Sequence, residues 1–272
     1  MTDGPRRRRR RIPPLRKGVY LLPNLFTTAG LFAGFFAVIA TLRADYSLAA
    51  AMVLVAQCCD ALDGRVARLT RTGSSFGVQY DSLADLIAFG VAPAILVYAW
   101  ALEGLGRWGW LAASFYVTCG ALRLARFNVQ ASSVERQHFV GLPIPAAAAV
   151  IATTILLHYD FRGEAAPHRP WLMLGLMFVL AALMVSEVRY LSFKDVQLHR
   201  RHPLPVLLGL IVLGAVTVGA PWPMLFAMAV CYAVSGPFAL MVRLMGPGSE
   251  AGAASRAPLR AVAPLDKIGD RR

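Results

Sequence analysis

The sequence predicts an all-α integral membrane protein that crosses the bilayer about eight times. Of its 272 residues, 57% are hydrophobic, and the mean hydropathy is +0.55. Several apolar runs approach the roughly 20 residues that a helix needs to span a bilayer, and a soluble core cannot absorb so many of them. The net charge is +13. The basic residues fall between apolar runs and not on one compact domain, so we expect no nucleic-acid partner.

Each expected helix is an apolar run bounded by polar residues, glycine or proline. The first opens at Pro23 and carries Gly30 and Gly34, small residues that permit close helix packing. The second and third flank one polar connection, the fourth ends at a basic patch, and later helices begin at or near prolines. The expected ranges are Asn24–Leu42, Tyr46–Leu69, Ser82–Leu102, Trp108–Leu124, Pro143–Leu157, Trp171–Val188, Pro203–Gly219 and Met224–Met245.

The chain divides into a basic N-terminal segment (residues 1–22), a membrane domain (23–245) and a disordered tail (246–272) rich in Gly, Ala, Pro and Arg. An even number of crossings places both ends on one side. Only Arg43, Arg107, Arg162 and Arg169 then lie on the other side, so 24 of the 28 Lys and Arg residues share the side of the termini. The positive-inside rule therefore predicts an inner-membrane protein with both termini in the cytoplasm.

Four aspartates flank the connection between the second and third expected helices. Asp60 and Asp63 are three residues apart, and Asp81 and Asp85 are four apart, so each pair lies on one helical face. The short polar connection, which includes Gly77, makes the two helices antiparallel neighbours and brings all four acids to one cytoplasmic end. Such a cluster repels itself unless it holds a cation. Oxygen ligands favour Mg²⁺ or Mn²⁺ over zinc.

Small residues and one arginine follow the first acid pair. Gly64 and Ala67 leave room for a bulky ligand beside the helix backbone. Arg68 supplies a fixed cationic fork that suits phosphate. Carboxylates, a metal and an arginine together indicate phosphoryl transfer, in which positioning and charge neutralisation supply most of the catalysis.

These residues resemble the signature of the CDP-alcohol phosphatidyltransferases. Every fixed position of that signature is filled, by Asp60-x-x-Asp63-Gly64-x-x-Ala67-Arg68 and then, after eight residues, Gly77-x-x-x-Asp81-x-x-x-Asp85. The resemblance implies a six-helix catalytic core plus two further helices, and a homodimer. It also implies two divalent ions held by Asp60, Asp63 and Asp81, with Asp85 as both ligand and general base. Gly64, Ala67, Arg68 and Gly77 would contact CDP-diacylglycerol.

Further patches resemble the bacterial phosphatidylserine synthases within this family. They are LPNLFTTAGLFAGF in the first helix, ALRLARFN at the end of the fourth, GLPIPAAA from Gly141 and MVSEVRYLSFK from Met184. The resemblance implies transfer of the phosphatidyl group from CDP-diacylglycerol to L-serine with release of CMP. Asn24 and Thr27 would then line the nucleotide pocket. The alternative for these two residues is that they only cap the first helix.

A serine acceptor brings an α-carboxylate, which needs a charge-assisted partner once it leaves water. We expect at least one of four cations to bind it, namely Arg123, Arg126, Arg189 or Lys194. Two alternatives for the function stay open. The same chemistry can use another alcohol, such as glycerol phosphate, inositol phosphate or choline. Alternatively, the acids form the ion site of a divalent-cation transporter, although the second half of the chain carries no copy of the acidic motif.

Overall fold

The structure is a computed structural model that describes residues 21–70, 75–131, 141–163, 169–188, 190, 208, 211 and 214–245. These residues are helical apart from short connections and include no strand. The predicted all-α class is therefore confirmed. The elements are α1 (Leu21–Leu42), α2 (Tyr46–Thr70), α3 (Ser75–Asp85), η1 (Leu86–Val91), α4 (Ala92–Val97), η2 (Tyr98–Leu102), η3 (Glu103–Leu105), α5 (Arg107–Ala131), α6 (Ile144–Arg162), α7 (Pro170–Val185) and α9 (Pro221–Met245).

Five helical segments in the described part of the chain are long and apolar enough to cross a membrane, so the chain is an integral membrane protein. They are Asn24–Leu42, Tyr46–Leu69, Phe76–Leu105, Ile144–Arg162 and Pro221–Val242. The helix α7 is apolar but shorter. The helix α5 has 25 residues but is less apolar. Most of the predicted crossing at 203–219 lies outside the described residues, as do residues 1–20 and 246–272, so the count of eight stays a prediction.

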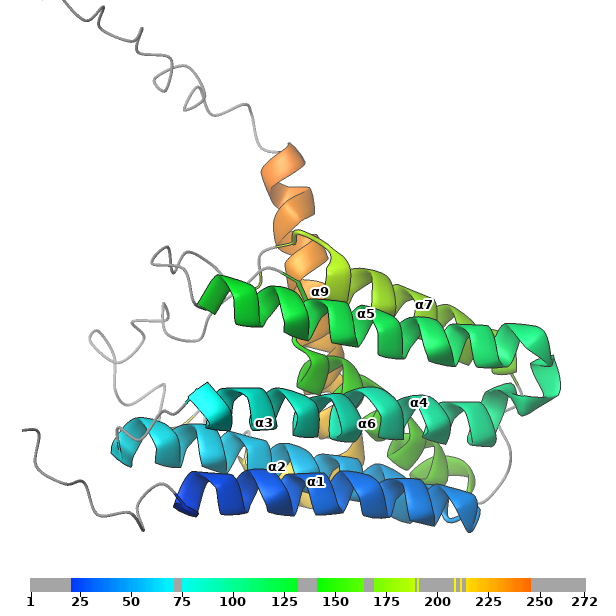
Figure 1. The fold of residues 1–272 in the computed structure, drawn as a ribbon. Helices are drawn as coiled ribbons and strands as arrows, with labels where there is room; N and C mark the ends of the chain where they lie inside the picture. The colour runs from blue at the N-terminus through cyan, green and yellow to red at the C-terminus, as the bar shows by residue number, and fades with distance from the viewer. Residues whose placement is uncertain are drawn as a thin grey trace, which may run out of the picture.

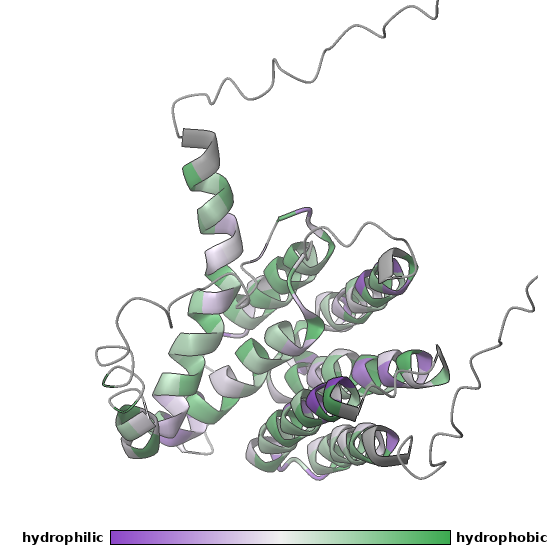
Figure 2. Ribbon diagram, turned by 90° about the vertical axis from the view of Figure 1, so that its left-hand side faces the viewer, coloured by the Kyte–Doolittle hydropathy of each residue, from purple (hydrophilic) through white to green (hydrophobic). Residues whose placement is uncertain are grey.

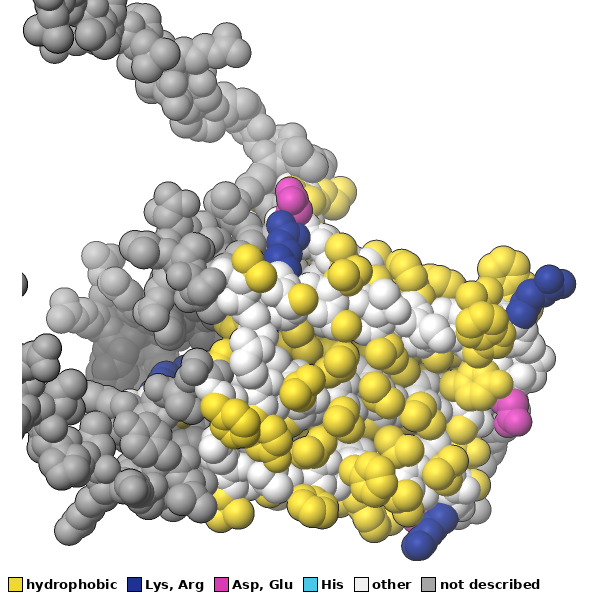
Figure 3. Space-filling model, viewed as in Figure 1, with side chains coloured by type: hydrophobic (Ala, Val, Ile, Leu, Met, Phe, Trp, Pro, Cys, Tyr) yellow, Lys and Arg dark blue, Asp and Glu magenta, His cyan; other side chains and the backbone are white. Residues whose placement is uncertain are grey.

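The helices pack side by side as a bundle, which α9 crosses steeply (Figure 1). The α1 helix packs along α2, α5 along α7, and α6 against α9. Along the bundle, green hydrophobic residues predominate on the helices (Figure 2). In Figure 3 hydrophobic side chains cover most of one lateral face, and the described charged side chains lie toward its edges. This distribution fits a bundle surrounded by lipid.

The third spanning segment is one continuous helical run from α3 to η3. It begins at Ser75 and not near Ser82, so Gly77 and Asp81 lie inside a helix and the predicted position of Gly77 in a connection is wrong. Two π-helical turns, η1 and η2, interrupt its α-helical geometry. Pro93 has no N–H to donate to the carbonyl of Phe89 one turn earlier. The buried hydroxyl of Tyr116 donates to that carbonyl at 3.0 Å instead.

Several helix ends also differ from the prediction. The α6 helix continues to Arg162, so His158 and Asp160 are helical and do not lie in an outer loop. The His158 ring contacts the Trp100 ring edge-on, with 5.1 Å between centroids. This contact joins α6 to η2 beyond Leu157, where the predicted helix ended. The α1 helix begins at Leu21, so the alternative that Asn24 and Thr27 cap it is wrong.

At Gly34, α1 lies against Ala88 of the third segment with no room for a side chain. A Cβ atom built there would lie 2.6 Å from the Cα of Ala88 and 2.7 Å from its Cβ. Gly34→Ala must therefore push α1 away, and we expect a loss of about 1–3 kcal/mol in stability. A thermal melt of the detergent-solubilised protein measures this effect. The matched control is Gly175→Ala in α7, where nothing lies within 4 Å of the added methyl group. Equal melting temperatures for the two variants would contradict the packing argument.

Candidate active site

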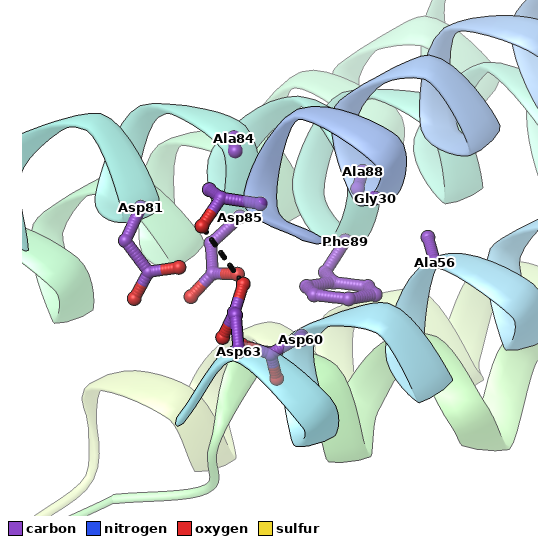
Figure 4. A pocket seen from close by; sticks show the side chains of 10 residues that line it. Gly30, Ala56, Asp60, Asp63, Asp81, Ala84, Asp85, Ala88 and Phe89 are labelled. Carbon is purple, nitrogen blue, oxygen red and sulfur yellow. Dashed lines mark hydrogen bonds between the residues drawn. The ribbon is translucent and has the colours of Figure 1, made fainter. Parts of the chain in front are cut away.

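The four aspartates converge as the spacing predicted. Asp60 and Asp63 lie in the last turns of α2, and Asp81 and Asp85 lie in the last turns of α3. Figure 4 shows their carboxylates turned toward one space between the two helices. Asp60, Asp63 and Asp81 each offer an oxygen, and these oxygens all lie within 4.8 Å of one another. Asp85 lines the same pocket beside this group.

Small residues form the wall of the pocket behind the acids. Ala56 comes from α2, Gly30 from α1, and Ala84 and Ala88 from the third segment, with the Phe89 ring beside them. A side chain larger than methyl at these positions would fill the space in front of the carboxylates. The sequence therefore combines acids that bind a cation with neighbours that leave room for a ligand.

The carboxylates fit a divalent cation. Their ligand set is oxygen only, as hard cations prefer. Among the described residues none of the four forms a salt bridge, because the one ion pair there joins Arg126 to Glu187. Asp63 is only 6% exposed and the other three are half-buried, so water screens them incompletely, and such closely spaced carboxylates repel one another unless a cation neutralises them.

Two consecutive threonines of α1 tie the helices of the site together. Thr27 is buried, and its Oγ1 donates to Oδ2 of Asp63 at 2.9 Å, the dashed line in Figure 4. The Oγ1 atom of Thr28 is 2.9 Å from the hydroxyl of Tyr80, the residue before Asp81. The sequence analysis missed Thr28 and Tyr80, although a Thr-Thr pair inside an apolar helix is a signal that could have found them. These bonds fix α1 against both acid-bearing helices.

Comparison with known proteins assigns the family. The family model described as CDP-alcohol phosphatidyltransferase matches residues 20–186, which include all four aspartates. The chain belongs to the CDP-alcohol phosphatidyltransferase family. Because the members of this family are enzymes, the alternative of a divalent-cation transporter is wrong.

Named relatives share most of the chain. A CDP-diacylglycerol–serine O-phosphatidyltransferase of Helicobacter pylori (strain J99) is 40% identical over 182 residues, which cover 66% of this chain and 75% of that protein. The enzyme of the same name from Mycobacterium tuberculosis (strain H37Rv) is 31% identical over 237 residues, covering 84% and 82%. An archaetidylserine synthase of Methanothermobacter thermautotrophicus is 35% identical over 173 residues, covering 62% and 69%.

Most of the other positions expected to bind CDP-diacylglycerol do not line this pocket. Of the six positions expected to bind CDP-diacylglycerol, only Thr27 lines the pocket that the acids form. Arg68 is exposed, and its Nη2 atom lies 3.9 Å from where a Cβ of Gly64 would be, so its guanidinium turns back along α2 toward the acids. The remaining positions are half-buried near the same end: Asn24 in α1, Gly64 and Ala67 in α2, and Gly77 in α3.

The structure separates the four cations expected to bind serine. Arg123 of α5 is half-buried and lies within electrostatic range of Asp85. Its guanidinium carbon is 5.7 Å from the centre of the Phe127 ring. Arg126, with 42% of its side chain exposed, instead pairs with exposed Glu187 at 3.3 Å. Arg189 and Lys194 lie outside the described residues.

Proposed function

We propose that this chain transfers the phosphatidyl group of CDP-diacylglycerol to the hydroxyl of L-serine, giving phosphatidylserine and CMP. The observation that carries the proposal is the convergence of the four signature aspartates around one pocket in a chain of this family. The names of the bacterial relatives support serine as the acceptor, and the archaeal relative is also named for a serine product.

In this proposal the four aspartates hold two divalent cations, either Mg²⁺ or Mn²⁺, because carboxylate oxygens are the ligands that such ions prefer. The four are Asp60, Asp63, Asp81 and Asp85. A cation held by these carboxylates would neutralise the charge of the pyrophosphate and of the departing CMP. Arg68 adds a guanidinium that can pair with a phosphate oxygen. Asn24, Thr27, Gly64, Ala67 and Gly77 complete the face on which the nucleotide lies.

Asp85 is the general base. Its carboxylate takes the proton of the serine hydroxyl as the serine oxygen forms a bond to the phosphorus of the phosphatidyl group. The bond from that phosphorus to the oxygen of CMP breaks in the same displacement. The position of Asp85 beside the close group of three acids supports this role, because it borders both the metal site and the side where Arg123 lies.

The proposed setting is the inner membrane, with the acids and both termini in the cytoplasm, where CDP-diacylglycerol meets soluble serine. The distribution of 24 of 28 basic residues supports this orientation. We also propose that the protein is a homodimer. Each chain would consist of a basic segment (1–22), a membrane domain (23–245) and a tail (246–272).

In the decisive assay, membranes that contain this protein are incubated with CDP-diacylglycerol and one alcohol at a time: serine, glycerol phosphate, inositol phosphate or choline. We expect CMP release with serine alone, loss of release in a chelator, and recovery with added Mg²⁺ or Mn²⁺. Release with one of the other alcohols and none with serine would overturn the proposed acceptor. Release that a chelator leaves unchanged would overturn the proposed role of the acids.

Arg123 is the described cation best placed to bind the serine carboxylate, because it is half-buried and close to Asp85. Arg123→Gln should raise the KM for serine roughly ten-fold or more, as expected for a lost hydrogen bond between charged groups worth about 1.5–3 kcal/mol. The KM for CDP-diacylglycerol should change much less. Arg126→Gln is the matched control, since its exposed ion pair contributes at most about 1 kcal/mol. An unchanged serine KM in the Arg123 variant would contradict the assignment.

A further inference from the structure

The α9 helix lies outside the residues that match the family, yet one of its side chains lies near Arg123, the cation beside Asp85. The match ends at residue 186, whereas α9 runs from Pro221 to Met245. It packs against α6 and crosses behind α5 and α7 (Figure 1). Its half-buried Tyr232 lies within electrostatic range of Arg123, the cation beside Asp85. A side chain from α9 therefore lies near the cation that borders the site.

A proline and a glycine create a docking notch for Tyr190 in α9. Pro237 has no N–H, so the carbonyl of Ala233, one turn earlier, loses its helical donor. The Tyr190 hydroxyl donates to that carbonyl at 3.1 Å. A Cβ atom on Gly236 would lie 2.5 Å from Cζ of Tyr190, so only glycine admits the ring. Burial and the neighbouring Tyr232 raise the pKa of Tyr190 to about 12, so its hydroxyl stays protonated and donates at neutral pH.

The notch fixes the position of Tyr232. The segment that carries Tyr190 is held to the start of α6, because the N–H of Gly141 donates to the carbonyl of Val188 at 2.9 Å. The rings of Tyr190 and Tyr232 are 5.7 Å apart between centroids, at 34°. These contacts hold the part of α9 around Tyr232 against the segment that carries Tyr190. The same segment also reaches α5, because Glu187 pairs with Arg126, and Tyr232 lies within electrostatic range of Arg123, one turn earlier in α5.

We propose that Tyr232 is a specificity-determining residue for the acceptor, whose phenol hydroxyl donates to the carboxylate that Arg123 binds. A carboxylate has two oxygens with several lone-pair sites, so it accepts from a guanidinium and from a phenol at once. An acceptor without a carboxylate loses both bonds and leaves the two donors without that partner. The inference rests on the proposed function, since it assumes an acceptor with a carboxylate near Asp85.

The test is Tyr232→Phe, which keeps the ring packed on Tyr190 and removes only the hydroxyl. We expect the KM for serine to rise about 5- to 10-fold, as for the loss of one hydrogen bond to a charged group. The values of kcat and of the KM for CDP-diacylglycerol should stay within about two-fold, because a hydroxyl that acts on the acceptor alone affects neither. The matched control is Tyr46→Phe, which removes a hydroxyl bonded to the Ala99 carbonyl at the opposite end of the bundle.

Two further measurements make the outcome decisive. In the double variant with Arg123→Gln, the two effects on the serine KM should be less than additive, because both residues bind one carboxylate. The preference of Tyr232→Phe for serine over ethanolamine should also fall. A serine KM within two-fold of wild type would overturn the inference, and so would equal losses in kcat and in both KM values. Failure of the proposed function is recognised separately, because the wild-type protein would then release no CMP with serine.

Discussion

Asp85→Asn is expected to lower kcat by about 100- to 10,000-fold, the range over which a positioned general base acts. The amide that replaces the carboxylate has nearly the same shape but cannot take the proton of the attacking hydroxyl. Asp60, Asp63 and Asp81 stay in place and still offer oxygens within 4.8 Å of one another. Binding of CDP-diacylglycerol, measured by equilibrium binding to the purified protein, should therefore change little. Single-turnover CMP release measures the chemical step itself.

Asp45→Asn is the matched control for this variant. Asp45 lies at the opposite end of the bundle, where its Oδ1 accepts from the Leu48 N–H, and an asparagine oxygen can accept in its place. It should therefore retain normal turnover. The role of Asp85 as base is refuted by near-normal turnover of the Asp85 variant. Loss of nucleotide binding in that variant would instead make Asp85 chiefly a metal ligand.

The second large effect concerns the metal requirement. Asp63→Asn removes one anionic ligand from the group of three and leaves an amide in a buried position. Half-maximal activity should need at least roughly 100-fold more Mg²⁺ or Mn²⁺, above the 10- to 100-fold that loss of a supporting hydrogen bond costs in metal affinity. Metal titration of activity, together with calorimetric metal binding, measures the shift.

Thr27→Val gives the graded comparison. It removes only the hydroxyl that holds Oδ2 of Asp63, so the carboxylate stays but can rotate. We expect a shift of about ten-fold in the metal requirement, between wild type and Asp63→Asn, and recovery in Thr27→Ser. The assignment of Asp63 as a ligand does not survive if the metal requirement is the same in all these proteins.

The acid cluster could be predicted from the sequence because its geometry is local. Spacings of three and four residues place Asp60 with Asp63 and Asp81 with Asp85 on single faces, and one short connection brings the helices together. The start of the third segment was missed for an equally local reason. Gly77 and its polar neighbours have weak helix propensity, but packing against α1 overrides that preference.

The residues proposed to bind the acceptor could not be predicted in the same way, because their positions depend on contacts between segments that are distant in the sequence. Arg123 and Arg126 are three residues apart and look equivalent in sequence, yet one approaches Asp85 and the other pairs with Glu187. No spacing connects either arginine to Tyr232 in α9. The bond between Thr28 and Tyr80 likewise depends on how closely α1 meets α3.

Because of the π turn after Asp85, the site depends on the exact number of residues between Asp85 and Pro93. In this turn the N–H of Ala92 donates to the carbonyl of Ile87, five residues earlier, so the turn holds one residue more than an α turn. Removing one residue between Asp85 and Pro93 would rotate the preceding part of the helix by about 100° relative to the rest. Asp81 and Asp85 would then face away from α2, while Ala88 lost its register against Gly34. An insertion or deletion in this stretch should therefore be far more harmful than most substitutions of its apolar side chains.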